Sequence, residues 1–292
     1  MTYAAVLGVT FVVLAAALLV AGRRFRANVS RLATRVALYA RQIAFSSALQ
    51  HIRARHPGAW EFVAQRFEPE EYLGLHLTAG LTISIGALWL FGTLMEDVLN
   101  HTAVTQFDVT ILEWFHRNNT EMGIRIFEAI SFLGSPVVLS VLGVAFAIYF
   151  VKRHAWIFLA SWISALAGAG ILDWVLKATV KRPRPAYAVA ILHGHSFSFP
   201  SGHALASLMA YGMTAYFVIV LRVKKSLSRE IVISLATILI LAIGVSRLYL
   251  GVHYFTDVIA GYAAGTVWLS ACVTGAEIAR RQPAAENSEQ RT

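Results

Sequence analysis

Seven runs of about 20 mostly apolar residues constrain the fold of this chain more than any other feature. A bilayer core about 30 Å thick is crossed by roughly 20 apolar residues in a helix, so each run is long enough to span a membrane. The sequence therefore predicts an all-α membrane protein. The runs comprise residues 3–22, 74–95, 127–150, 155–175, 203–222, 230–249 and 254–275.

The composition agrees with a membrane location. Of the 292 residues, 57% are hydrophobic and 14% are charged, whereas a soluble domain has about 25% charged residues. The net charge of +9 fits cytoplasmic loops beside anionic lipid better than a nucleic-acid partner. We therefore expect membrane lipids as partners and no nucleic acid. The single cysteine, Cys272, excludes an internal disulfide bond.

The positions of the Lys and Arg residues predict the orientation. The first run has no basic residue before it and is followed by Arg23, Arg24 and Arg26, the reverse of a secretory signal peptide. We expect a retained helix with its N-terminus outside. Of the 25 Lys and Arg residues, 18 then fall on the inner side, as expected of cytoplasmic segments. These segments are residues 23–73, 151–154, 223–229 and 276–292, with Arg222 counted in the third.

The chain divides into four expected parts. The second part mixes Arg with apolar residues, which favours an interfacial helix that anchors the chain or binds a partner. Within the third part, residues 96–126 combine acidic residues with Trp114 and Phe115, which favours a short helix at the outer surface. The last part is polar, and we expect it to be frayed from residue 284. The four parts are an N-terminal transmembrane helix (1–22), a basic cytoplasmic or interfacial segment (23–73), a six-span core (74–275) and a polar cytoplasmic tail (276–292).

A basic cluster, residues 177–185, lies at the predicted outer end of the fourth run. We expect Lys177 to close the helix, while Pro183 and Pro185 keep the chain around Arg184 extended and turn its guanidinium toward the bundle. Lys supplies a point charge and Arg a planar fork of donors, a combination suited to a phosphate. Taken alone, the cluster also fits a basic anchor that contacts lipid head groups.

A second cluster, Pro200-Ser201-Gly202-His203, begins the fifth run. Ser201 is a natural N-cap, and Gly202 lets a ligand approach the backbone. The free N–H groups of a helix N-terminus bind anions, and His203 on the first turn points where an anion would lie. A single histidine at this place also fits a polar residue at the membrane interface.

A third cluster, residues 247–257, joins the sixth and seventh runs. His253 and Asp257 are four residues apart, so on a helix the carboxylate can hydrogen-bond an imidazole nitrogen. On an unbroken helix Arg247 would face elsewhere, so we expect a break at Gly251 that separates two helices. Ionisable residues at membrane depth mark functional sites by default.

All three clusters fall at predicted outer ends of their spans, so one shallow cavity can collect them. Three cations, a helix N-terminus and two histidines would then converge there. Two His and one Asp resemble a zinc ligand set, but the adjacent Lys and Arg would repel a cation. We therefore expect a site for an anionic ligand, with no metal and no cofactor.

The three clusters, in this order, resemble the signature of the type 2 phosphatidic acid phosphatase family. K-x6-R-P corresponds to Lys177–Pro185, P-S-G-H to Pro200–His203, and S-R-x5-H-x3-D to Ser246–Asp257, and every motif position matches. The resemblance implies a six-helix phosphatase bundle with a metal-independent active site, here with one extra N-terminal transmembrane helix. Residues 1–72 lie outside the family's common core.

The resemblance also implies residue roles. His253 would attack phosphorus to give a phosphohistidine, with Asp257 fixing its tautomer. His203 would protonate the leaving oxygen and later help water to attack. Lys181 and Arg182 are not strict motif positions, and we expect them to attract the head group or diphosphate. The residues expected to hold the phosphoryl oxygens are Lys177, Arg184, Ser201, Gly202 and Arg247.

The substrate is expected to be amphiphilic. The related vanadium haloperoxidases are soluble, whereas these motifs cap apolar spans, so a lipid phosphate or diphosphate would enter from the outer leaflet. Candidates are undecaprenyl diphosphate, phosphatidylglycerol phosphate, phosphatidic acid and a lipid A type phosphate. The Ala- and Arg-rich composition favours a bacterial inner membrane with the site facing the periplasm. Glycosylation-like triplets at Asn100 and Asn118 leave a eukaryotic host open.

Two other functions remain open at this point. The same residues would permit transfer of the phosphoryl group to another lipid in place of water. A transporter or flippase would bind a phosphorylated lipid without cleaving it, although the sequence lacks the inverted repeats typical of transporters. The sequence does not indicate the oligomeric state.

Overall fold

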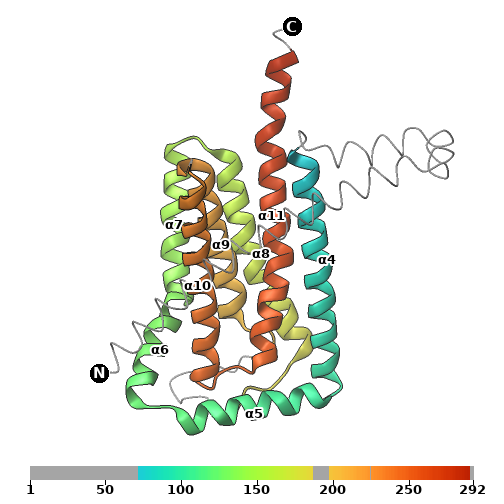
Figure 1. The fold of residues 1–292 in the computed structure, drawn as a ribbon, viewed down its shortest axis with the longest axis vertical. Coiled ribbons are helices and arrows are strands. Elements are labelled where there is room, and N and C mark those ends of the chain that lie inside the picture. Colours follow the sequence, from blue (N-terminus) through green and yellow to red (C-terminus); the bar gives the residue numbers. More distant parts are fainter. Residues whose placement is uncertain (1–71, 187–196, 224, 290–292) are drawn as a thin grey trace, which may run out of the picture. The chain divides into compact units, whose positions relative to one another are not determined.

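The computed structural model describes residues 72–186, 197–223 and 225–289, which form helices without any strand (Figure 1). The expected N-terminal helix, residues 1–22, lies outside the described residues, as does nearly all of the basic segment 23–73. The helices are α4 (Tyr72–Leu99), α5 (Ala103–Asn118), α6 (Glu121–Leu133), α7 (Pro136–Lys152), α8 (Trp156–Val180), α9 (Gly202–Arg222), α10 (Ser226–Tyr249) and α11 (Phe255–Glu289).

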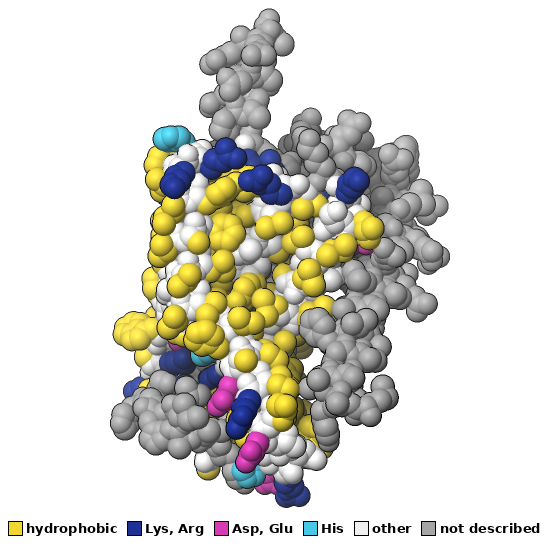
Figure 2. Space-filling model, turned by 90° about the vertical axis from the view of Figure 1, so that its left-hand side faces the viewer, with side chains coloured by type: hydrophobic (Ala, Val, Ile, Leu, Met, Phe, Trp, Pro, Cys, Tyr) yellow, Lys and Arg dark blue, Asp and Glu magenta, His cyan; other side chains and the backbone are white. Residues whose placement is uncertain are grey.

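Within the described residues, six helical stretches are long and apolar enough to cross a membrane. Large apolar side chains such as Trp89 and Trp174 are exposed on them, as lipid-facing side chains are. Figure 2 shows a broad band of hydrophobic side chains on one face, with Lys and Arg side chains at both ends of it. The all-α membrane fold with a six-span core is therefore confirmed. The stretches are Gly80–Leu99, Glu121–Lys152, Trp156–Val180, Gly202–Arg222, Ser226–Tyr249 and Phe255–Arg280.

The chain forms two compact units. One comprises residues 1–79 and 224–235, of which the structure describes the first turns of α4 and the beginning of α10. The other comprises residues 80–223 and 236–292 and contains every residue of the three motifs. The description below concerns this second unit alone.

The core of the second unit is built around α11, which packs against α5, α8 and α9. Small residues allow these helices to approach closely. A Cβ atom at Gly168 of α8, for example, would overlap the indole of Trp268 on α11, as expected from the small residues around this position. Aromatic side chains fill the layer between α7, α8 and α9, where Phe150, Trp162 and Phe217 are fully buried.

The third apolar run is divided into two helices. α6 ends at Leu133, and Ser135 caps α7 by accepting a hydrogen bond from the Val138 N–H at 3.3 Å. Pro136 occupies the first turn of α7, where its missing N–H costs nothing. The expected single helix over 127–150 therefore contains a break at Gly134–Ser135, although the whole segment stays apolar enough to span.

Two helix ends differ from expectation. α8 continues three residues beyond Lys177 and is closed by Lys181, which adopts a left-handed conformation with φ of 50°. α11 continues to Glu289, whereas we expected a frayed tail from residue 284. Most of residues 277–282 have high helix propensity, and the helix continues through Pro283 to Glu289.

Candidate active site

The structure brings the three motif regions together at one end of the bundle. The Ser201 N–H donates to the Asp257 carbonyl at 2.9 Å, and Arg184 Nη1 donates to the Val252 carbonyl at 3.1 Å. The first and second motifs therefore both contact the third. The groups close enough to interact electrostatically with His203 are Lys177, Arg184, Arg247 and His253.

The N-terminus of α9 forms one wall of the site. Ser201 is fully buried and caps the helix, because its Oγ accepts from the Ala204 N–H at 3.5 Å. A Cβ atom at Gly202 would lie 2.7 Å from Asp173 Oδ1, so a glycine is needed for α8 to approach this helix end. The expected N-cap at Ser201 is confirmed, and His203 lies on the first turn of α9.

Lys177 reaches this wall from the last turn of α8. Its Nζ lies 2.8 Å from Asp173 Oδ2, the pair expected from their spacing of four residues. The other carboxylate oxygen, Asp173 Oδ1, is buried and has no hydrogen-bond partner among the described residues. Asp173 therefore holds the ammonium group close to the N-terminus of α9.

Arg184 lies among residues 181–186, which follow α8 without regular secondary structure. Ser198 holds this segment, since its N–H donates to the Arg182 carbonyl at 2.9 Å and its hydroxyl donates to the Pro183 carbonyl at 3.0 Å. Burial lowers the pKa of Arg184 from its ordinary value, although Asp257 and Asp173 oppose the shift. The guanidinium is directed into the bundle end, as the flanking prolines predict.

Arg247 is a buried cation at the end of α10, with 4% of its surface exposed. Its Nη1 donates to Ser131 Oγ on α6, while its Nε has no hydrogen-bond partner among the described residues. Within that part of the chain no carboxylate forms a salt bridge with it. A buried charge without a counter-ion is costly, so the surroundings of Arg247 suit an anionic ligand.

His253 and Asp257 follow the expected break between two helices. Gly251 has φ of 66°, a left-handed conformation that favours glycine, and it separates α10 from α11. His253 Nδ1 lies 3.4 Å from Asp257 Oδ2, which also accepts from the Tyr254 N–H at 2.9 Å. The carboxylate thus faces Nδ1 and leaves Nε2 as the nitrogen that can react.

The imidazole of His253 is neutral at neutral pH. Its side chain is 2% exposed, and this burial lowers its pKa from 6.5 to about 4, although the hydrogen bond and negative charge of Asp257 oppose the shift. If the proton stays on Nδ1, facing the carboxylate, Nε2 carries an available lone pair. A lone pair on a buried, oriented nitrogen is what a nucleophile requires.

Arg182 differs from its expected role at the head group. Its Nη1 donates to Asp257 Oδ1 at 2.6 Å and to Thr256 Oγ1 at 2.8 Å, and its Nη2 donates to Asp108 Oδ2 at 2.8 Å. The guanidinium also lies 4.0 Å from the centre of the Tyr254 ring. Because these partners draw it inward, Arg182 points away from the surface, whereas Lys181 is exposed.

Two contributors were not identified from the sequence. Asp108 on α5 is completely buried and accepts from the Thr256 N–H at 2.9 Å. Ser131 on α6 contacts Arg247. Both come from segments that precede the three motifs. Asp108 and Thr256 are 148 residues apart in the sequence, and Ser131 and Arg247 are 116 residues apart.

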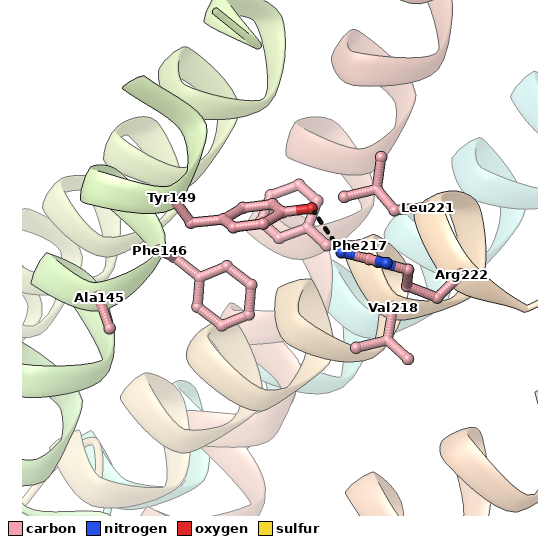
Figure 3. A pocket seen from close by; sticks show the side chains of 7 residues that line it. All are labelled: Ala145, Phe146, Tyr149, Phe217, Val218, Leu221 and Arg222. Carbon is pink, nitrogen blue, oxygen red and sulfur yellow. Dashed lines mark hydrogen bonds between the residues drawn. The ribbon is translucent and has the colours of Figure 1, made fainter. Parts of the chain in front are cut away.

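Within the part of the chain that the structure describes, no metal cluster accompanies this site, and an apolar groove lies away from it. Among the described residues there is no group of three His, Cys, Asp or Glu side chains that could hold a metal ion. An apolar groove of about 310 Å³ lies between α7 and α9, lined by Phe146 and Phe217 and bordered by the Tyr149–Arg222 hydrogen bond (Figure 3). Phe217 is 14 residues from His203 along α9, roughly 20 Å at 1.5 Å per residue, so the groove is remote from the motifs.

Comparison with known proteins agrees with the three motifs. The profile of the PAP2 superfamily matches residues 154–280. The chain is 31% identical over 187 residues to phosphatidylglycerophosphatase B of Bacillus subtilis (strain 168). This alignment covers 61% of this chain and 88% of that protein.

Solved structures are similar as well. The crystal structure of the first transmembrane PAP2 type phosphatidylglycerolphosphate phosphatase from Bacillus subtilis aligns with a TM-score of 0.60 and 28% identity, over 65% of this chain and 93% of that chain. LpxE of Aquifex aeolicus aligns with a TM-score of 0.43 and 22% identity, over 56% of this chain and 93% of LpxE.

Proposed function

Because this chain belongs to the PAP2 superfamily of membrane phosphatases, we propose that it hydrolyses a lipid phosphate or diphosphate through a phosphohistidine on His253. The membership confirms the resemblance that the three motifs carry. The observation that supports the mechanism is the placement of one buried imidazole, oriented by Asp257, beside the buried guanidinium of Arg247.

The first step is phosphoryl transfer to the enzyme. The Nε2 lone pair of His253 attacks phosphorus, an N–P bond forms and the P–O bond to the lipid breaks. His203 donates a proton to the leaving oxygen. Asp257, facing Nδ1, stabilises the positive charge that develops on the imidazole.

The second step releases phosphate. His203 takes a proton from a water molecule, whose oxygen attacks phosphorus while the N–P bond breaks. His253 returns to its neutral form, and inorganic phosphate leaves. In both steps the groups that hold the phosphoryl oxygens are Lys177, Arg184, Arg247, the Ser201 hydroxyl and the Gly202 N–H.

We place the site at the outer face of a bacterial inner membrane, open to the periplasm. The excess of Lys and Arg at the opposite helix ends supports this orientation. The substrate is a lipid of the outer leaflet. Since the Bacillus relative is a phosphatidylglycerophosphatase, phosphatidylglycerol phosphate joins phosphatidic acid and undecaprenyl diphosphate as the first lipids to test.

The decisive experiment measures phosphate release by the purified protein from a panel of these lipids in detergent, without added metal. We expect release from at least one lipid and an acid-labile, alkali-stable phosphoenzyme on rapid quenching. His253→Ala is expected to lose both, by several orders of magnitude in rate. Full activity in that variant would refute the assigned nucleophile.

Product analysis separates the alternatives. Recovery of the intact lipid after long incubation would favour a transporter, and phosphate found on an added acceptor lipid would favour phosphoryl transfer between lipids. For the orientation, Lys181→Cys should react with a membrane-impermeant maleimide in intact cells, whereas Arg153→Cys at the opposite end should not. The native Cys272 is buried. The reverse labelling pattern would place the site inside.

A further inference from the structure

We propose that Asp108 and Arg182 are positioning residues that hold Asp257 against His253, and that the helix α5 thereby determines the reactivity of the nucleophile. The inference rests on the proposed function, because it assigns these residues to the same histidine. Neither residue belongs to the three motifs.

The two oxygens of Asp257 have separate partners. Oδ2 accepts from the Tyr254 N–H and faces His253, whereas Oδ1 accepts from Arg182 Nη1 at 2.6 Å. A carboxylate held at both oxygens has one orientation. Without Arg182, the carboxylate can rotate about its Cβ–Cγ bond and lose its alignment with Nδ1.

Arg182 is itself held from two sides. Its second terminal nitrogen, Nη2, lies 2.8 Å from Asp108 Oδ2, and the side chain is only 10% exposed. Burial alone would lower the pKa of Arg182, but the charges of Asp257 and Asp108 raise it above its ordinary value. Arg182 therefore stays cationic, and Asp108 supplies the second negative charge around it.

Asp108 also holds the beginning of α11. Its Oδ1 accepts from the Thr256 N–H at 2.9 Å and its Oδ2 accepts from the Thr256 hydroxyl at 2.6 Å. The first N–H groups of a helix lack partners within the helix. Asp108 therefore acts as a cap supplied by another helix and fixes the turn that carries Asp257.

α5 is seated on this end of the bundle by further contacts. Phe107 packs edge-on against Phe255 at 6.0 Å between ring centres, and Phe115 packs against Tyr249 at 5.9 Å. Figure 1 shows α5 lying across the end of the bundle where α11 begins. The position of Asp108 thus depends on how α5 lies on the bundle.

The test is Asp108→Asn, which removes the charge and preserves the shape. In metal sites, removal of a group that orients a ligating side chain lowers metal affinity or activity by roughly 10- to 100-fold, and we take the same range for a group that orients a reacting side chain. We expect kcat to fall by about that factor while KM changes less than about threefold, because Asp108 does not touch the phosphate-binding cations. Glu113→Gln is the matched control on the same helix, since among the described residues the salt bridge of Glu113 is to the exposed Arg117 at 2.9 Å, and it should keep the wild-type kcat.

A second variant guards against simple unfolding. Arg182→Lys keeps the positive charge but replaces the planar fork, whose two terminal nitrogens each reach one carboxylate, with a single ammonium nitrogen on a shorter side chain. We therefore expect a folded protein with a reduced kcat and a slower rate of phosphoenzyme formation. The ¹⁵N NMR spectrum of labelled histidine reports the His253 tautomer directly. We expect the Nδ1-protonated form in the wild type and a mixture of tautomers in both variants.

The outcomes separate this inference from the proposed function. Wild-type kcat and an unchanged tautomer in folded Arg182→Lys would overturn the positioning role. Wild-type kcat in folded Asp108→Asn would overturn the role of α5. Either result, combined with an inactive His253→Ala, leaves the phosphohistidine mechanism standing. Full activity of His253→Ala would instead remove the premise of both.

Discussion

The two sides of the site differ in how far the protein itself neutralises their buried charges. On the carboxylate side, formed by Asp108, Arg182 and Asp257, one guanidinium lies between two carboxylates at 2.8 and 2.6 Å. On the cation side, formed by Lys177, Arg184, Arg247 and His203, Asp173 pairs with Lys177, but Arg247 forms no salt bridge and its Nε has no hydrogen-bond partner among the described residues. The first side is completed by the protein, and the second is suited to completion by an anion.

This difference separates two tasks that a phosphatase must perform. A nucleophile needs a fixed orientation before the substrate arrives, so its supporting charges must be matched in advance. A phosphate site needs charge that strengthens its contacts as the reaction proceeds, so its cations are better left for the substrate to neutralise. Substitutions on the two sides should therefore have different signatures.

The largest effect is expected on the cation side. Arg247→Gln removes a buried positive charge that no carboxylate of the described chain neutralises, and loss of one donor to the developing charge costs about 10²- to 10³-fold in such sites. We expect a loss of this size in kcat/KM, measured by steady-state phosphate release. A loss of less than about tenfold would show that Arg247 does not contact the phosphoryl group.

Binding of inorganic phosphate should distinguish the two sides next. A ligand at 100 times its dissociation constant stabilises the folded state by about 2.7 kcal/mol. Phosphate should therefore raise the unfolding temperature of the wild type and of Asp108→Asn, but not that of Arg247→Gln, in a thermal scan in detergent. If phosphate did not raise the unfolding temperature of Asp108→Asn, the carboxylate side would also be required for phosphate binding, and the two sides would not have separate tasks.

The smallest effect concerns the pH dependence of stability. The pKa of His253 is lowered from 6.5 to about 4 by burial. Between pH 6.5 and 4, His253 is therefore protonated in the unfolded chain but not in the folded protein. The stability associated with the neutral His253 is fully present above pH 6.5. As the pH falls toward 4, the free energy of unfolding decreases by about 1.4 kcal/mol per pH unit at most.

A comparison with His253→Gln isolates this contribution. The variant lacks the titrating group. The unfolding temperature of the variant minus that of the wild type should therefore increase as the pH falls from 6.5 to 4. Titrating groups that do not interact with His253 affect both proteins alike and cancel in the difference. A constant difference across this range would mean that His253 is no harder to protonate in the folded protein than in the unfolded chain.

The sequence predicted the features that depend on neighbouring residues. Ser201 caps α9 and Lys177 pairs with Asp173 because both interactions are set by helix geometry over three or four positions. Gly251 marks the break that brings Arg247 and His253 to one end. The length and hydropathy of the runs were enough to predict the six spans.

The carboxylate side could not be predicted in the same way. Asp108 and Thr256 are 148 residues apart, and no local pattern specifies a contact at that separation. One signal was present: Asp108 lies four residues before Leu112, so the two share the buried face of α5. A carboxylate on an otherwise buried helix face requires a partner, although the sequence does not say which one.

Arg182 and Arg184 show the same limit at closer range. Both are arginines in one extended segment, and residue type alone gives them the same role. Their contacts in the structure distinguish them. Arg182 forms salt bridges with two carboxylates, and Arg184 donates a hydrogen bond to the backbone carbonyl of Val252. The surroundings that separate them come from α5 and α11, not from the segment itself.

The origin of Asp108 and Ser131 limits how small a working version of this protein can be. A polypeptide begun at residue 154, where the superfamily profile begins, would retain every motif residue. It would nevertheless bury Arg182 without one of its two carboxylates and Arg247 without its hydroxyl partner. Any attempt to transplant the catalytic unit into another scaffold must therefore carry α5 and α6 along with it.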